Sequence, residues 1–245
     1  MFSSGRIETA NALTAILIVL STGLAARAQA LSVIPVNILL TPGQRATTLT
    51  ITNQGASETA IQIRAYTWSQ KDGNDQLAPT DAVVVSPPLA SIAAGATQVV
   101  RLILRQPPVG SEATYRILID QIPPPAEAGV VHVVLRLSIP IFAQPMTRAL
   151  AHIQFHTEKD AGQLYLVGTN DGLRHEAIRD IALLAADGGK LKLDAGASPY
   201  ILAGSTRRWH FTAQDALPLP GESLRLTAHG DAGVIEQQVP VAAQP

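Results

Sequence analysis

Apolar and polar positions alternate between residues 129 and 145. Side chains at every second position of a strand share one face. Pro140, on the opposite face, cannot donate a backbone hydrogen bond, which is typical of an edge strand or a strand end. The stretch is therefore either a site that adds a partner's strand or an ordinary strand inside a sandwich. The apolar members of the shared face are Val131, Val133, Leu135, Leu137, Ile139 and Ile141.

The rest of the first half contains further short alternating or β-branched runs, separated by Gly, Pro, Asn and Asp. Turn signals recur about every ten residues, which is typical of an antiparallel sandwich. The pattern predicts an all-β fold of the immunoglobulin type for residues 31–145. The expected strands are residues 32–40 (interrupted by Pro35), 47–52, 60–68, 83–85, 97–105, 113–122 and 129–142.

The pattern restarts after Pro145, which we interpret as a linker. Residues 179–186 contain Ala and Leu, which favour a helix, but their β context favours a strand. Residues 146–245 are therefore predicted to form a second, smaller sandwich. Its expected strands are residues 150–157, 163–170, 177–185, 190–194, 206–212, 224–229 and 234–239.

The N-terminal residues 1–30 have the features of a secretory signal. Arg6 precedes an apolar run at residues 12–25, and residues 28–30 (Ala-Gln-Ala) offer a small-x-small cleavage site. The run is too short to favour a spanning helix. We expect export, a mature chain beginning near Leu31 and no stable membrane insertion; the alternative is an uncleaved anchor.

Composition excludes several classes of protein. The chain has 245 residues, no cysteine and a net charge of −1, so thiolate chemistry is excluded and charge gives no reason to expect nucleic acid as a partner. None of the six histidines stands at a recognised metal-ligand spacing. The chain also has no Gly-x-Ser-x-Gly elbow and no phosphate-binding loop. We predict no metal, no cofactor and no catalysis.

Three arginines lie within apolar strand segments: Arg101, Arg116 and Arg136. Each either faces solvent or holds a carboxylate through a forked hydrogen bond. Glu112 and Asp231 are candidate carboxylate partners within the chain.

Several segments together resemble the first domain of periplasmic pilus-assembly chaperones, the PapD-like family. Residues 68–75 resemble the archaic branch of that family, which serves Csu-type pili. The resemblance is good over residues 31–145 and loose beyond them. The segments that carry it are residues 49–53, 86–88, 94–95, 100–102, 111–123 and 139–142.

The resemblance implies two immunoglobulin-like domains arranged as a boomerang. In that family the last strand of the first domain fills the open groove of an incomplete pilin subunit, which is donor-strand complementation. An outer-membrane usher then receives the subunit. The implied partners are therefore pilin subunits and an usher, in the periplasm, and the implied donor residues are Val131, Val133, Leu135 and Leu137.

The chain departs from the better-known branch at the anchor for the subunit's terminal carboxylate. Asn37 and Pro140 stand where that branch has an arginine and a lysine, so neither supplies a cation. Arg116 and Arg136 are our candidate replacements, because a carboxylate in a cleft needs a cation or several donors.

The family's internal ion network is matched at three positions, Arg101, Glu112 and Asp231, while Gln144 stands in place of an arginine. We expect Arg101 to pair with the two carboxylates between or beside the domains.

Two other functions compete with a chaperone. One is a secreted structural or adhesive sandwich protein of a surface appendage, and the other is a periplasmic enzyme whose site the sequence does not mark. An adhesive protein should protect the edge at residues 129–142, whereas a chaperone should expose it.

Overall fold

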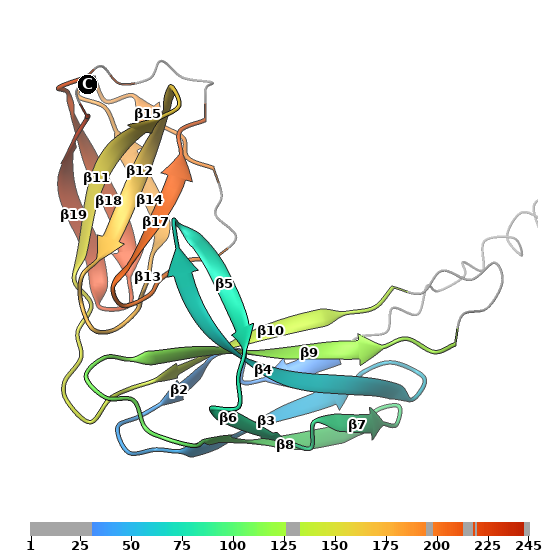
Figure 1. Cartoon of the computed structure of the whole chain (residues 1–245). Coiled ribbons are helices and arrows are strands. Elements are labelled where there is room, and N and C mark those ends of the chain that lie inside the picture. Colours follow the sequence, from blue (N-terminus) through green and yellow to red (C-terminus); the bar gives the residue numbers. More distant parts are fainter. Residues whose placement is uncertain (1–30, 126–132, 195–197, 213–217, 219, 243–245) are drawn as a thin grey trace, which may run out of the picture.

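The computed structural model describes residues 31–125, 133–194, 198–212, 218 and 220–242. The described residues form β-strands and connections, without a helix. Two lobes meet at an angle, one built from the strands up to residue 143 and the other from those after residue 152 (Figure 1). No segment among these residues is a helix of the length and apolarity needed to cross a membrane. The predicted signal at residues 1–30 lies outside the described residues.

The first lobe is a sandwich of two sheets, as predicted. One sheet has the order β1-β3-β8-β6 and the other β2-β10-β9-β4-β5, with β7 also paired to β4. The strands of the first sheet are β1 (Leu31–Ile34), β3 (Ala46–Asn53), β8 (Thr97–Leu104) and β6 (Val83–Ser86). Those of the second are β2 (Ile38–Leu40), β10 (Arg136–Ala143), β9 (Ala113–Ile122), β4 (Thr59–Lys71), β5 (Asn74–Pro79) and β7 (Leu89–Ile92).

Alternating side chains of the two facing sheets form the core of this lobe. Leu49 and Ile51 of β3 meet Ile61 of β4 and Ile117 of β9, and all four are fully buried. This follows from the period of two along each strand. Burial of each such side chain is worth about 1.5–3 kcal/mol.

The second lobe is a separate sandwich with its own core around Leu166, Leu224 and Leu226. Residues 179–184 are a strand, so the β interpretation is confirmed over the helical one. The sheets of the second lobe have the orders β11-β12-β17, β13-β16 and β15-β14-β18-β19. The strands are β11 (Ile153–Asp160), β12 (Gln163–Asn170), β13 (Glu176–Ala177), β14 (Arg179–Leu184), β15 (Lys190–Leu191), β16 (Tyr200–Ile201), β17 (Ser205–His210), β18 (Ser223–Gly230) and β19 (Gly233–Pro240).

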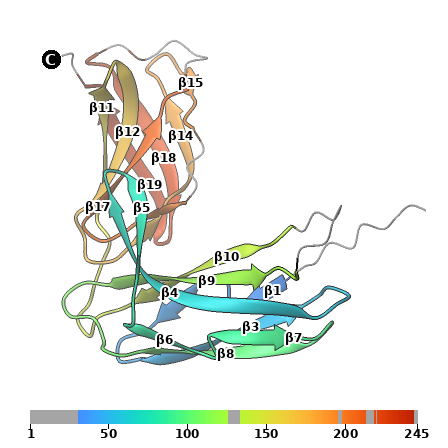
Figure 2. The ribbon, with the colours of Figure 1, turned by 45° about the vertical axis from the view of Figure 1, so that its right-hand side comes forward.

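The β4–β5 hairpin reaches from the first lobe along the second (Figure 2). A small apolar cluster joins the lobes, with Trp68 of the hairpin and Phe142 from the first lobe and Tyr200 and Leu202 from the second. The rings of Trp68 and Tyr200 meet edge to face, with centroids 5.6 Å apart. These contacts lie between the two sandwiches and join them.

The observed strands differ from the predicted ones mainly at polar edges. β5 and β7 are additional strands; every residue of β5 is exposed, so its sequence lacks the alternation that marks a half-buried strand. Of the predicted strand at residues 129–142, residues 136–142 belong to β10, residues 133–135 are not assigned to a strand, and residues 126–132 lie outside the described residues.

Candidate functional site: an open strand edge beside an interdomain junction

Within the part of the chain that the structure describes, strand β10 has a free edge along its first half. It pairs antiparallel with β9 over its whole length, whereas β2 covers its other side only at residues 141–143. The backbone N–H of Gln121 donates to Leu135 O at 3.0 Å, so by the antiparallel alternation the odd-numbered residues of β10 bond to β9. The N–H of Gln144 donates to Leu40 O of β2 at 2.9 Å, which fits the same alternation.

The even-numbered residues Arg136, Ser138 and Pro140 therefore point their backbone groups at the free edge. Arg136 and Ser138 each offer an N–H and a C=O to an added strand. Pro140 has no N–H to leave unpaired, and it stands just before the point where β2 begins to cover the edge. The edge prediction made from Pro140 agrees with this arrangement.

The apolar face of β10 passes from core to surface along the strand. Ile141 is fully buried and Ile139 is 5% exposed, whereas Val133 is 78% exposed. Leu137 is half-buried and packs against the core of the first lobe, and Leu135 is half-buried. Of the predicted donor residues, Leu135 and Leu137 thus form a row beside the free edge, and Val133 is exposed just before it. Val131 lies outside the described residues.

Arg136 lies on the opposite face of β10, where it already has a carboxylate partner. Asp120 of β9 forms ion pairs with Arg136 and, at 2.7 Å, with Arg64 of β4. Partial burial opposes ionisation of Asp120, but hydrogen bonds from the two guanidinium groups outweigh it and lower the pKa of this carboxylate below its ordinary value. Arg136 therefore ties the start of β10 to β9.

Arg116 lies at the junction of the two lobes. Its guanidinium carbon is 3.7 Å from the centroid of the Trp68 ring and 6.0 Å from that of Tyr200. Burial lowers the pKa of Arg116, and the negative charge of Asp75 opposes this only in part. No ion pair found in the described part of the chain includes Arg116.

The same corner holds Asn37, in the connection between β1 and β2. Its Nδ2 donates to the hydroxyl of Tyr200 at 3.4 Å. Arg116 and Arg136 do not lie together. Arg116 of β9 stands opposite Pro140 of β10, which is four residues, or about 13 Å, along the strand from Arg136. The sequence did not single out Tyr200, and no pattern in the chain marks it.

Glu112 and Asp231 meet at His175, in what we call the interdomain clasp (Glu112, Phe142, His175 and Asp231). Glu112 Oε2 accepts hydrogen bonds from His175 Nδ1 at 2.6 Å and from the His175 backbone N–H at 2.8 Å. His175 Nε2 is 3.8 Å from Asp231 Oδ2. The Phe142 ring of β10 stacks on the His175 ring, with centroids 3.5 Å apart and planes 10° apart.

The structure corrects the predicted ion network in one member. Arg101 is exposed on β8 of the other sheet, between Thr48 and Ser86, and no ion pair among the described residues includes it. His175 takes the place that we assigned to Arg101. The alternation along β8 in the sequence puts Arg101 and Val99 on the same face. In the structure that face is exposed to solvent.

Gln70 of the β4–β5 hairpin forms hydrogen bonds with the second lobe. Its Nε2 donates to Tyr200 O at 2.9 Å, and its Oε1 accepts from the backbone N–H of Leu202 at 3.0 Å. The side-chain amide thus pairs with the backbone of the second lobe as a strand would.

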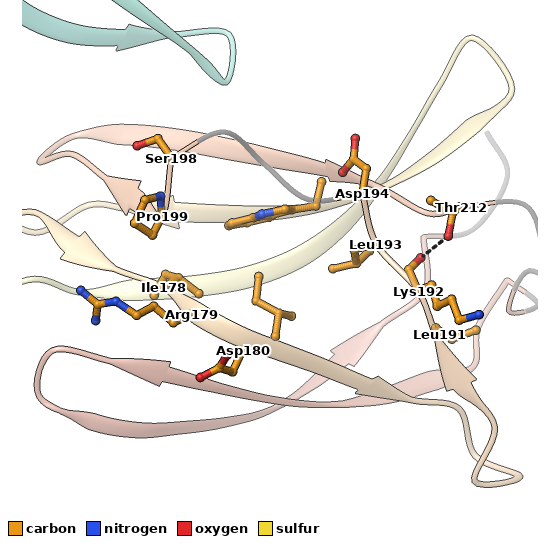
Figure 3. Close-up of a pocket in the computed structure, with 12 residues that line it drawn as sticks. Ile178, Arg179, Asp180, Leu191, Lys192, Leu193, Asp194, Ser198, Pro199 and Thr212 are labelled. Carbon is orange, nitrogen blue, oxygen red and sulfur yellow. Dashed lines mark hydrogen bonds between the residues drawn. The ribbon is translucent and has the colours of Figure 1, made fainter. Parts of the chain in front are cut away.

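A cavity of about 540 Å³ opens in the second lobe (Figure 3). Ile178 and Trp209 contribute buried apolar surface, and Arg179, Asp194 and Ser198 are among its polar residues. The cavity lining contains no histidine or cysteine. No cluster of three or more metal-ligand side chains was found among the residues that the structure describes. We assign no catalytic role to this cavity.

Comparison with solved structures supports the two-lobe fold. The chain is similar to one from the CsuC–CsuE chaperone–tip adhesion subunit complex of Acinetobacter baumannii archaic Csu pili, with 20% identity and a TM-score of 0.64 over 88% of this chain and 100% of that one. It is also similar to the E. coli chaperone DraB, with 19% identity and a TM-score of 0.56 over 88% and 97%.

A third similar structure is that of the Salmonella enterica SafA pilin in complex with the SafB chaperone, with 12% identity and a TM-score of 0.61 over 87% of this chain and 98% of that one. No curated protein matches the chain in sequence. Residues 30–149 match the family model described as pili and flagellar-assembly chaperone, PapD N-terminal domain. The first domain of the chain therefore belongs to the PapD-like family of pilus-assembly chaperones.

Proposed function

We propose that the protein is a periplasmic chaperone that holds an incomplete pilin subunit by donor-strand complementation and delivers it to an outer-membrane usher. The observation that carries this proposal is the free edge of β10 with its half-exposed apolar row. Backbone groups at the edge supply affinity, and the row of alternate side chains supplies specificity. The function is binding without turnover.

The row would enter successive pockets of the subunit's groove. Val133, Leu135 and Leu137 are the described members, and Val131 continues the row in the sequence. Each Val or Leu side chain that becomes fully buried on binding contributes up to about 1.5–3 kcal/mol. The row therefore supplies a large part of the stability of the complex.

A secreted structural or adhesive protein is the alternative. Such a protein should protect an apolar edge, for example with charged or bulged edge residues. Here Arg136 is turned toward Asp120, and the edge beside Leu135 and Leu137 stays uncovered by any described strand. The exposed edge favours the chaperone.

We further propose Arg116 as the anchor for the subunit's terminal carboxylate. Its guanidinium is partly buried and has no ion pair with a described residue. A carboxylate from a partner would therefore offset the desolvation cost of this buried charge. Asn37 lies in the same corner and offers an amide donor. Arg136, our other candidate, already shares Asp120 with Arg64 and is the weaker one.

Capture of a co-expressed pilin subunit tests the donor row. Leu135→Asp places a charge in an apolar pocket and should abolish co-purification while the chaperone alone stays folded, because Leu135 is only half-buried. Ile139→Asp is the matched control: Ile139 is 5% exposed in the core, so this variant should fail to fold. If Leu135→Asp folds and still captures the subunit, the donor strand lies elsewhere.

A further inference from the structure

Glu176 is a buried carboxylate at the end of the second lobe that faces the linker. Its residue is 8% exposed, and its Oε1 accepts the backbone N–H of Asp231 in the β18–β19 turn. Gly230 makes room for it, since a Cβ at that position would lie 2.7 Å from Glu176 Oε1. The carboxylate is therefore held in place through one oxygen.

Glu176 has no cation within ion-pair distance in the part of the chain that the structure describes. The other carboxylate of similar burial, Glu112, is bound by His175. Arg179 is near but pairs with Asp231 at 3.1 Å. Burying a carboxylate without a cation is unfavourable. A positively charged group that binds beside Glu176 would therefore be stabilised.

The carboxylate lines a cavity of about 220 Å³. Ala151, Ile153 and Ile235 give the cavity an apolar wall, and Gly230 and Gly233 leave it open at the hairpin turn. No described residue donates a hydrogen bond to Glu176 Oε2. The cavity thus combines a fixed negative charge with apolar sides.

Exposed apolar side chains lie in the lining of this cavity and on the chain next to it. Val234, which lines it, is 59% exposed. Leu150 precedes the lining residue Ala151 and is 57% exposed, and its carbonyl accepts the backbone N–H of Leu173, which is 48% exposed. A cluster of exposed apolar side chains at one place marks an interaction surface.

We propose that this cavity binds a lysine side chain of a partner protein, with apolar residues flanking that lysine. The unbranched stem of lysine packs along apolar surface while its compact ammonium reaches a charge. The carboxylate at Glu176 and the apolar rim match both parts. The surface belongs to the second lobe, whereas the open edge of β10 belongs to the first, so the inference goes beyond the proposed function.

NMR titration of the full mature chain with two short peptides tests the proposal. The probes are acetyl-leucyl-lysyl-valine amide and the same peptide with norleucine, which keeps the unbranched stem and lacks the ammonium. We expect the lysine peptide to bind at least about tenfold more tightly, with amide shifts at Glu176, Gly230 and Asp231. Equal affinities, or shifts confined to other surfaces, overturn the proposal.

Glu176→Gln separates charge from structure, because the amide oxygen still accepts the N–H of Asp231. This variant should lose the preference for lysine over norleucine. Glu236→Gln, an exposed change on the same hairpin, should keep it. Retained preference in Glu176→Gln also overturns the proposal, and the two-peptide comparison on the unaltered protein decides the matter if that variant does not fold.

Discussion

Replacing His175 by Phe should weaken the attachment of the two domains. The Glu112 side chain is 0% exposed, and its Oε2 accepts two hydrogen bonds from His175. The variant keeps the backbone donor at 2.8 Å and loses the Nδ1 donor at 2.6 Å. A hydrogen bond to a charged group is worth about 1.5–3 kcal/mol, so the free energy of unfolding should fall by that amount.

His175→Ala should cost more, because it also removes the stacked ring. Phe142 and His175 lie 3.5 Å apart between centroids, and an aromatic pair adds about 0.5–1.5 kcal/mol. The expected loss for the alanine variant is therefore about 2–4.5 kcal/mol. The difference between the two variants measures the contribution of the stack.

Urea unfolding followed by tryptophan fluorescence is a suitable assay, since Trp68 is 2% exposed at the domain junction. Small-angle X-ray scattering on the same samples reports the angle between the domains. Arg179→Ala is the control: it breaks an ion pair whose side chains are 49% and 31% exposed, which should cost at most about 1 kcal/mol. If His175→Phe is no more costly than Arg179→Ala and the scattering is unchanged, the interdomain clasp does not hold the domains.

Two further predictions concern the first domain. Asp120→Asn should lower the free energy of unfolding at neutral pH, measured by urea unfolding. The lowered pKa of Asp120 stabilises the fold above the unfolded-state pKa of about 3.9, and this contribution is lost as the pH drops through the folded-state pKa. The difference in stability between the variant and the unaltered chain should therefore shrink as the pH falls. Gln70→Ala should speed hydrogen exchange of the Leu202 amide and cost about 1–3 kcal/mol, because it removes the bonds at 2.9 and 3.0 Å to the second domain; unchanged exchange at Leu202 would contradict the role assigned to the hairpin.

The local pattern of apolar and polar residues was sufficient to predict a strand wherever that strand has one buried face. Residues 163–170 were predicted as a strand and are β12 with those bounds, and residues 224–229 lie within β18. Side chains two positions apart share a face whatever the rest of the chain does, so such strands are visible in the sequence. β5 was missed because it is exposed on both faces and is a strand only through its pairing with β4.

The apolar row beside the edge of β10 could be predicted because apolar alternation and Pro140 are both local signals. Its division into a core part at Ile139 and Ile141 and a half-exposed part at Leu135 and Leu137 could not. That division depends on how far the core between the two sheets extends along β10, which is a property of the assembled sandwich.

The sequence by itself determined the all-β class, the alternation that builds two sandwiches and the apolar row beside an edge strand. The tertiary structure decided which charges meet. Glu112 and His175 are 63 residues apart in the chain and Arg116 comes to rest on Trp68 and Tyr200 from two domains. A side-chain period reports the face of a strand, whereas an ion pair or a ring stack needs two distant strands brought within a few ångströms, and only the packing of the whole chain sets that distance.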